Sequence, residues 1–166
     1  MRPFIFMSMA ETRTNAMRIL DRMGIDYGTL YYDVEEFISG NDAAERSGVP
    51  EDLDFKTLIA QGKSERYCVF VLPVSHELDM KKAARSVGEK SVDLIPVKDI
   101  NRITGYVRGG CSPLGIKRNC KIVIDSSALA HDTVYVSGGK IGCSIYLRPE
   151  DLAKAAGASF ADIILE

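Results

Sequence analysis

The sequence predicts a single domain of mixed α/β class, in which peripheral helices cover a mixed β-sheet. Its 166 residues, 46% hydrophobic and 27% charged, have the composition of a globular domain that buries a substantial core. Short helical patterns and short β-rich runs are interspersed without the regular strand–helix–strand alternation of a doubly wound fold. No internal repeat, low-complexity tract or linker divides the chain, which favours one domain.

In the first half of the chain, helical patterns end at glycines. The segment 11–23 places Ala16, Leu20 and Met23 on one face, and Gly24 follows as its stop signal. The other elements expected in this half are a strand over 25–33, a short helix from Asn41 or Asp42 to Gly48, a hairpin of strands over 55–61 and 67–74 around Gly62–Ser64, a helix capped by Asp79 that ends at Gly88, and a short helix over 97–104.

The second half begins with β-rich runs that glycine and proline interrupt. Strands are expected over 121–125, 133–137 and 144–147. A final helix begins near Pro149 and ends at Gly157, because proline suits a first helical turn and glycine suits a helix end. Residues 161–165 add a last strand or helical turn.

Composition excludes several classes of protein. The four cysteines form no CxxC pair, so reduced thiols in a cytoplasm are the simpler interpretation. Two isolated histidines, His76 and His131, argue against a zinc site. No apolar run approaches the roughly 20 residues of a membrane-spanning helix, and 1–10 is too short for a signal peptide. We therefore expect a cytoplasmic protein that does not enter the membrane.

Positive charge gathers in one segment although the net charge is −2. Between residues 100 and 124 there are five cations and no acid: Arg102, Arg108, Lys117, Arg118 and Lys121. Such a run is either a solvated basic face or a local phosphate-binding surface. The same segment holds a loop with four glycines in eleven residues, Gly105–Gly115, and a second glycine loop follows at Ser137–Lys140. Both loops are either structural turns or backbone cradles for an anion or oxyanion.

Individual side chains leave alternatives open at this stage. Lys56, at the start of a β-rich run, either points to solvent or enters a glycine-lined pocket, where its ammonium group holds a phosphate or polarises an ester. Tyr32 is either a core aromatic or a pocket wall. Cys111 and Cys143 neighbour the glycine loops, but neither has a histidine close in sequence, which favours buried thiols over nucleophiles.

Taken together, five ordered segments resemble the YbaK/EbsC family, whose members are relatives of the editing domain inserted in bacterial prolyl-tRNA synthetases. The resemblance covers about residue 17 to the C-terminus. Residues 11–166 are therefore expected to form one editing domain. Residues 1–10 form an N-terminal extension to which we assign no function, because Met7 and Met9 are alternative translation starts. The segments that carry it are Phe55–Leu58, Leu78–Lys82, Thr104–Gly115 with a G-x-x-x-P pattern at Gly109–Pro113, Val134–Lys140 and Phe160–Ile163.

The resemblance implies a compact α/β domain around a mixed, barrel-like sheet. It implies an enzyme, without metal or cofactor, that deacylates mischarged tRNA and above all removes cysteine from tRNA(Pro), with tRNA(Cys) as a further carrier. Prolyl-tRNA synthetase is the implied protein partner, because a chain of net charge −2 is expected to bind free tRNA poorly.

The family's essential lysine falls on Lys56 and its substrate-contacting glycine backbone on Gly109 and Gly110, the three residues expected to act in catalysis. The cysteine substrate's own thiol is expected to attack its carbonyl, so no protein nucleophile is needed. The substrate-binding residues implied are Tyr32, Thr57, Ser112, Pro113, Ser137, Gly138, Gly139 and Ser144.

One position departs from the family pattern. Ser144 stands where family members carry an aspartate suited to the substrate's ammonium group. Serine accepts a hydrogen bond but brings no charge, which opens the amino-acid preference. Two alternatives therefore accompany the cysteine hypothesis: a deacylase for Ala- or Ser-charged tRNA that uses a bound water, and a non-catalytic module that binds tRNA or a synthetase.

Overall fold

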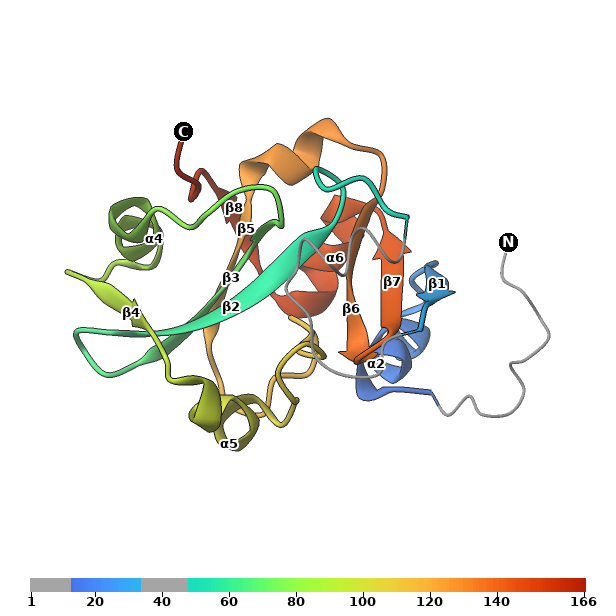
Figure 1. Ribbon diagram of the computed structural model, residues 1–166, viewed down its shortest axis with the longest axis horizontal. Coiled ribbons are helices and arrows are strands. Elements are labelled where there is room, and N and C mark those ends of the chain that lie inside the picture. The colour runs from blue at the N-terminus through green and yellow to red at the C-terminus, as the bar shows by residue number, and fades with distance from the viewer. Residues whose placement is uncertain (1–12, 34–47) are drawn as a thin grey trace.

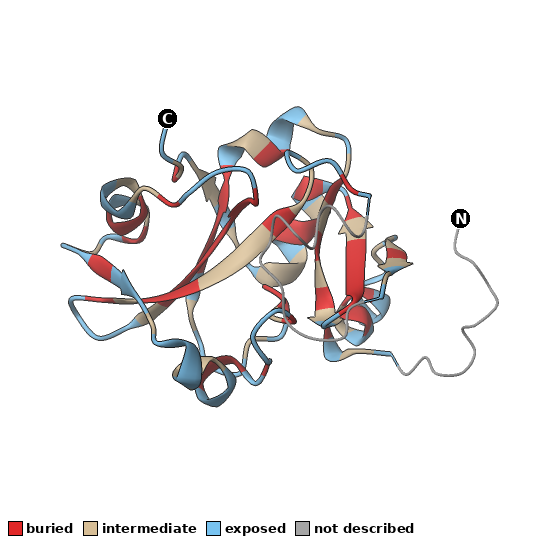
Figure 2. Cartoon of the chain, viewed as in Figure 1, coloured by how far each residue is buried: buried red, intermediate tan, exposed pale blue. Residues whose placement is uncertain are grey.

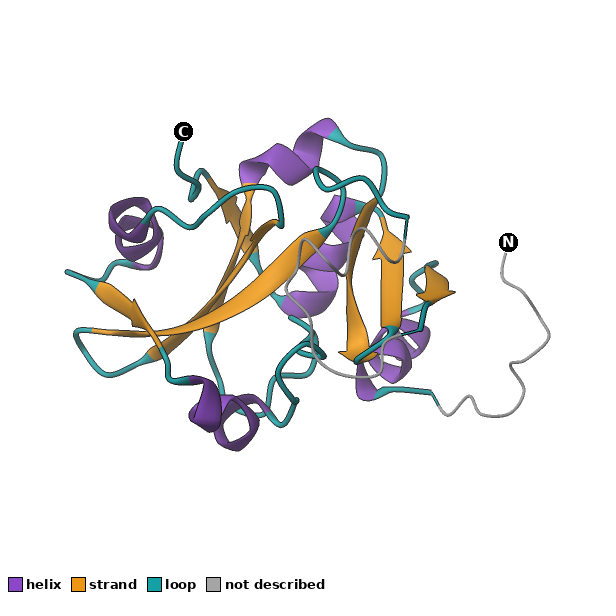
Figure 3. Ribbon diagram, in the orientation of Figure 1, coloured by secondary structure: helices purple, strands orange, loops and turns teal. Residues whose placement is uncertain are grey.

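The computed structural model describes residues 13–33 and 48–166, which form one mixed α/β domain built on two β-sheets (Figures 1 and 3). The larger sheet has the strand order β4-β2-β3-β5-β8, and the smaller has the order β1-β7-β6. The strands are β1 (Gly28–Tyr31), β2 (Phe55–Gly62), β3 (Tyr67–Pro73), β4 (Val92–Leu94), β5 (Lys121–Asp125), β6 (Val134–Lys140), β7 (Cys143–Leu147) and β8 (Ser159–Ala161). The helices are α2 (Asn15–Met23), α4 (Met80–Val87), α5 (Ile100–Thr104) and α6 (Pro149–Ala156), with 3₁₀ turns η1 (Val97–Asp99) and η2 (Ser126–Ala130).

The central strand β3 explains why its sequence is a continuous apolar run. Successive side chains of a strand point to opposite faces, and both faces of β3 are covered. Phe70 and Leu72 pack into the cluster that contains the apolar side of α4. Val69 and Val71 pack into the main core with α2, α6 and the smaller sheet. Figure 2 shows this buried strand at the centre of the molecule.

The two sheets meet where β2 begins beside β6. Asp54 forms an isolated parallel bridge with Tyr135, and the Tyr135 amide donates to the Leu53 carbonyl at 2.9 Å. Otherwise β2 pairs with β3 and β4, while β6 pairs with β7. Among the described strands the result is two joined sheets rather than one closed barrel, so the barrel-like description drawn from the resemblance is loose.

Helix boundaries follow their caps. The Asp79 carboxylate accepts from the amides of Lys81 and Lys82, each at 3.0 Å, and α4 ends at Gly88 with a positive φ of 73°, as the sequence predicts. Thr14 caps α2 in the same way, with its hydroxyl accepting from Met17 at 3.2 Å. The helix therefore begins at Asn15 among the described residues rather than at residue 11.

Several other elements differ from expectation. The first strand is shorter than 25–33, and the helix expected from about residue 42 lies outside the described residues apart from Gly48, a turn. The strand β4 and the turn η2 were not expected, because a three-residue strand and a single turn carry too little periodicity to detect. The last strand or turn, expected over 161–165, is the strand β8, which begins two residues earlier. Strand β6 continues to Lys140 through an irregularity between Ser137 and Lys140.

The described part of the chain, 13–33 and 48–166, lacks two features. No helix there combines the length and apolar character needed to cross a bilayer. Nor does any group of three His, Cys, Asp or Glu side chains lie together in a way that could hold a metal ion.

Candidate active site

A cavity of about 400 Å³ opens at the start of β2, where the two sheets meet. Segments far apart in the sequence form its walls: β2, the end of β1, the β6–β7 hairpin, η1 with α5, and the glycine loop. Six of the eleven residues predicted for the site line it: Tyr32, Lys56, Thr57, Gly109, Ser137 and Ser144. A cavity of this size fits a small ligand such as the aminoacyl end of a larger molecule.

Lys56 lies on β2 and reaches the cavity half-buried. Burial lowers the pKa of its ammonium group, and the nearby charge of Glu77 partly offsets that effect. The next residue, Thr57, has a hydroxyl that is buried and makes no hydrogen bond with any described group. Both residues of β2 line the cavity, one with a cationic side chain and one with an unused hydroxyl, although successive side chains of a strand point to opposite faces.

The β6–β7 hairpin supplies the opposite wall. Ser137 and Ser144 are cross-strand partners, so their side chains share one face of the smaller sheet. The Tyr32 amide donates to the Gly142 carbonyl at 2.9 Å, which places the tyrosine beside them. Burial raises the pKa of Tyr32, and a hydrogen bond from the Ser144 side chain partly opposes the change. These three residues form a wall of hydroxyl groups.

The glycine loop divides into a cavity-lining part and a supporting part. Gly109 lines the cavity with a φ of 84°, a conformation that favours glycine. Gly110 is not among the lining residues, and its amide donates to the Val107 carbonyl at 2.9 Å. A Cβ on Gly110 would lie 2.9 Å from the Lys140 Cα, so this residue allows close contact with the hairpin. The structure therefore gives Gly110 a packing role, and its substrate contact stays a prediction.

Four more predicted residues stand behind the cavity instead of lining it. The buried Ser112 hydroxyl accepts from the Leu114 amide at 3.1 Å, and Pro113 beside it is buried too. A Cβ on Gly138 would lie 2.5 Å from the Cys143 sulfur, and Gly139 has a φ of 106° beside Thr14 and Tyr106. Tight packing and turn geometry account for these four, namely Ser112, Pro113, Gly138 and Gly139.

Asp54, which was not predicted from the sequence, also lines the cavity. Burial raises the pKa of its carboxyl to about 7, and the negative charge of Glu51 adds to this effect. One signal was available: Asp54 precedes Lys56 by two residues, the spacing that puts two side chains on the same face of a strand. Many exposed strands show the same spacing of charged residues, so it does not indicate a site until the cavity is known.

Cys111 lines the cavity as well, but its chemistry is not that of a nucleophile. Burial raises the pKa of its thiol to about 11, so the reactive thiolate is scarce at neutral pH. Cys111 is part-buried, whereas Cys143, the other cysteine beside a glycine loop, is buried as expected.

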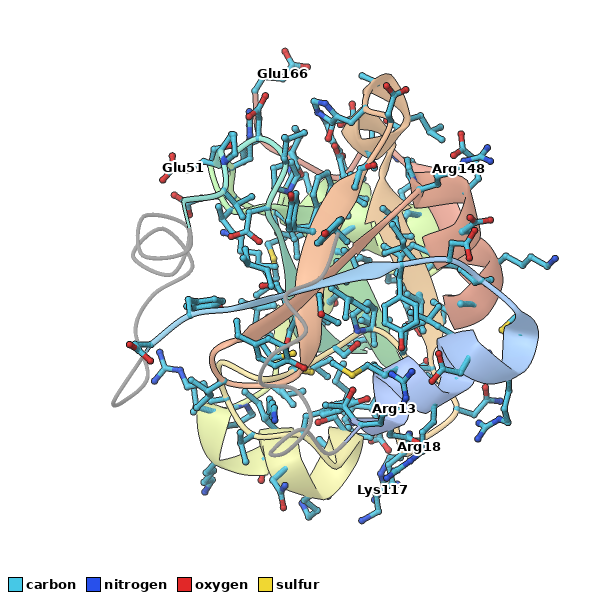
Figure 4. All side chains as sticks on the ribbon, turned by 90° about the vertical axis from the view of Figure 1, so that its right-hand side faces the viewer. Arg13, Arg18, Glu51, Lys117, Arg148 and Glu166 are labelled. Atoms are coloured by element: carbon cyan, nitrogen blue, oxygen red, sulfur yellow. The ribbon has the colours of Figure 1, made fainter. Side chains whose placement is uncertain are left out.

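The predicted basic segment is partly used by the fold. Arg102 pairs with Asp99 at 3.4 Å, and the Arg118 guanidinium lies 5.7 Å from the centre of the Tyr67 ring. Arg108 contributes to the cavity wall. In Figure 4, Lys117 lies close to Arg13 and Arg18 at the lower end of the molecule, beside α2. Arg102 and Arg118 thus interact within the protein, and phosphate binding by the other cations of the segment stays a prediction.

Comparison with known proteins gives this cavity a context. The sequence pattern of the aminoacyl-tRNA editing domain family matches residues 38–155. This chain belongs to that family.

Relatives of the editing-domain family resemble the chain along most of its length. A protein of Enterococcus faecalis, provisionally named Cys-tRNA(Pro)/Cys-tRNA(Cys) deacylase EbsC, is 35% identical over 154 residues, 92% of this chain and 94% of its own. The crystal structure of hypothetical protein APE2540 has a TM-score of 0.79 at 26% identity, covering 89% of this chain and 97% of that chain. A structure described as a candidate trans-editing enzyme for prolyl-tRNA synthetase has a TM-score of 0.78 at 21% identity, covers 93% of this chain and all of its own, and supports the fold.

Proposed function

We propose that this protein is a trans-editing deacylase that removes cysteine from Cys-tRNA(Pro), and from Cys-tRNA(Cys) as a second substrate. The observation that carries the proposal is the cavity, which brings Lys56, Thr57 and Gly109 together without an activated protein nucleophile. The name of the Enterococcus faecalis relative supports the choice of cysteine.

The chemistry requires little of the protein, because an aminoacyl ester is already activated. The cysteine thiol attacks its own carbonyl carbon, so a carbon–sulfur bond forms and the ester carbon–oxygen bond breaks. The thiol proton ends on the ribose hydroxyl that leaves, and the released cyclic thioester is then hydrolysed by water. The protein therefore acts by holding the cysteine side chain folded toward its carbonyl and by stabilising the oxyanion.

Lys56 is the group that we assign to the ester. Lys56 lines the cavity from β2, and its ammonium group makes no ion pair with a described carboxylate. A cation held in a partly desolvated site stabilises a developing oxyanion more strongly than the same cation in water. The Thr57 hydroxyl, which has no hydrogen-bond partner among the described groups, is available to the ester oxygens.

The tRNA body must remain outside a cavity of about 400 Å³. We assign its phosphates to the basic face formed by Arg13, Arg18 and Lys117 in Figure 4. Arg13 already pairs with Asp21 at 3.1 Å, so this face offers few unpaired charges. Weak binding of free tRNA follows, and prolyl-tRNA synthetase is the proposed partner that supplies the missing affinity. Equal affinity for tRNA with and without the synthetase would contradict this partnership.

The test of the function is a deacylation panel with Cys-, Ala- and Ser-charged tRNA. Hydrolysis of Cys-tRNA(Pro) well above the spontaneous rate, with little effect on the other two, is the expected result. Faster release of alanine or serine would replace the thiol mechanism by one that uses a bound water. No acceleration of any substrate would leave only a non-catalytic binding module.

Substitution of Lys56 tests the assigned role. We expect Lys56→Ala to lower kcat/KM roughly 100- to 1,000-fold, the effect of removing one oxyanion-stabilising group. The matched control is Lys63→Ala, since Lys63 is exposed in the turn after β2. A Lys56→Ala protein that keeps its circular dichroism spectrum and its full activity would exclude this residue from the chemistry.

A further inference from the structure

Asp54 is an acidic side chain for which the mechanism above has no use. It is the only acid among the described residues that line the cavity. No described cation lies within 4 Å of its carboxylate. A carboxylate withdrawn from water without a positive partner is costly, and none of the described residues supplies that partner.

The backbone fixes where this carboxylate lies. The Asp54 carbonyl accepts from the Val74 amide at 2.8 Å, at the end of β3. On its other side Asp54 pairs with Tyr135 of β6 in the bridge that joins the two sheets. Bridge partners carry their side chains on the same side, and residues two apart on a strand share a face. Asp54 therefore faces the side of the smaller sheet that carries Tyr135 and Ser137.

The groups around Asp54 are hydroxyls and negative charges. Tyr32 and Tyr135 face it, and the charge of Asp54 contributes to raising the pKa of both phenols. Glu51, exposed on the preceding turn, adds further negative potential. Two cationic residues line the cavity. Lys56 lies two residues further along the chain, where the charge of Glu77 acts on it, and Arg108 comes from the glycine loop. This end of the cavity thus combines negative potential with hydrogen-bond acceptors.

We propose that Asp54 binds the α-ammonium group of the aminoacyl ester, with the hydroxyls of Tyr32 and Ser144 as additional acceptors. The inference rests on the proposed function, because a free α-amino group is what distinguishes an aminoacyl ester from other esters. With its ammonium group at Asp54 and its ester carbonyl at Lys56, the substrate would lie along the start of β2. Asp54 is thus a specificity residue, and the carboxylate charge that Ser144 lacks comes from a different strand.

A pH dependence follows from this role. The carboxyl of Asp54 has a pKa of about 7 in the free protein, so the ammonium-binding form increases as pH rises toward neutrality. An α-amino group loses its own proton at about pH 8. The kcat/KM for a free-amino substrate should therefore rise to a maximum between about pH 7 and 8 and then fall. Asp54→Asn has no titrating group at this position, so its pH profile of kcat/KM should lack the rise on the acidic side.

The experiment compares Cys-tRNA(Pro) with N-acetyl-Cys-tRNA(Pro), which keeps the thiol and ester but lacks the cation. We expect Asp54→Asn to lower kcat/KM for Cys-tRNA(Pro) roughly 10- to 100-fold, mainly through KM, as a charge pair loses one partner. The acetylated substrate should change by about twofold at most. Glu51→Gln removes the neighbouring charge outside the cavity and should retain the preference for the free amine (Figure 4).

The outcomes separate the two proposals. Activity of the wild type on neither substrate refutes the deacylase function, and this inference with it. An active wild type with equal losses on both substrates in Asp54→Asn assigns Asp54 to the ester or to water and overturns only the ammonium role. An unchanged preference for the free amine overturns it as well.

A stability measurement shows whether Asp54→Asn folds. The pKa of Asp54 is raised from 3.8 to about 7 in the folded protein, so the folded state binds more protons than the unfolded state between these values. The wild type therefore loses stability as pH rises from about 4 to about 7. Asp54→Asn lacks this loss and should have the higher thermal midpoint at pH 8. A lower midpoint would mean that the carboxylate is already neutralised by the protein, contrary to the proposal.

Discussion

Gly110→Ala is the substitution that tests how the glycine loop supports the cavity. A Cβ at this position would lie 2.9 Å from the Lys140 Cα and 3.0 Å from the Ile141 nitrogen, both backbone atoms that cannot rotate away. Gly110 has no positive φ, so the added methyl acts through contact alone. The loop and the β6–β7 turn must separate, and the neighbouring Gly109 moves with them.

The magnitude follows from overpacking, which costs about 1–3 kcal/mol in a well-packed site. Taking about 2 kcal/mol and about 2–4 °C of Tm per kcal/mol for a domain of this size, we expect Tm to fall by about 4–8 °C. Displacing a substrate-positioning segment by a fraction of an ångström should also lower kcat/KM roughly 10- to 100-fold. Differential scanning calorimetry and the Cys-tRNA(Pro) assay measure the two effects.

Gly24→Ala is the matched control. Gly24 has a φ of 69° and no atom within 4 Å of the added Cβ, so this variant has only the left-handed strain, about 1–2 kcal/mol, and should keep full activity. If Gly110→Ala matches the wild type in both Tm and activity, the close approach of loop and hairpin is refuted. If it loses stability but not activity, the link to Gly109 is wrong.

Two other predictions concern buried groups. Cys111 should react with iodoacetamide at pH 8 at least about 100-fold more slowly than a free cysteine, because a thiol with a pKa of about 11 is only about 0.1% ionised at that pH. The variant Cys111→Ala should remain active. Rapid alkylation of Cys111, or an inactive variant, would support a catalytic cysteine. Asp125 is only 1% exposed, and its carboxylate accepts hydrogen bonds from the amides of Ile163 at 2.9 Å and Ser127 at 3.0 Å. Asp125→Ala should therefore lower the free energy of unfolding, measured in urea, by about 3 kcal/mol. A loss below about 1 kcal/mol would mean that water replaces both hydrogen bonds.

Local chemistry explains what could be predicted from the sequence. The ends of α4 and α6 were predictable because a capping carboxylate at Asp79, a proline at Pro149 and glycines at Gly88 and Gly157 act on the backbone beside them. The family was recognisable from ordered segments, which need no coordinates. Short elements such as β4 were missed, since three residues paired at an edge leave no periodic pattern.

The sequence by itself determined the α/β class and the family, because these depend on local patterns and on their order along the chain. The same patterns led to the prediction that Lys56 and the Gly109–Pro113 loop belong to the site. Only the tertiary structure separated Gly109, which lines the cavity, from Gly110, which packs behind it. Only the tertiary structure also brought Asp54 into the site. Its position depends on a bridge to Tyr135, 81 residues away along the chain, and no local pattern encodes such a long-range pairing.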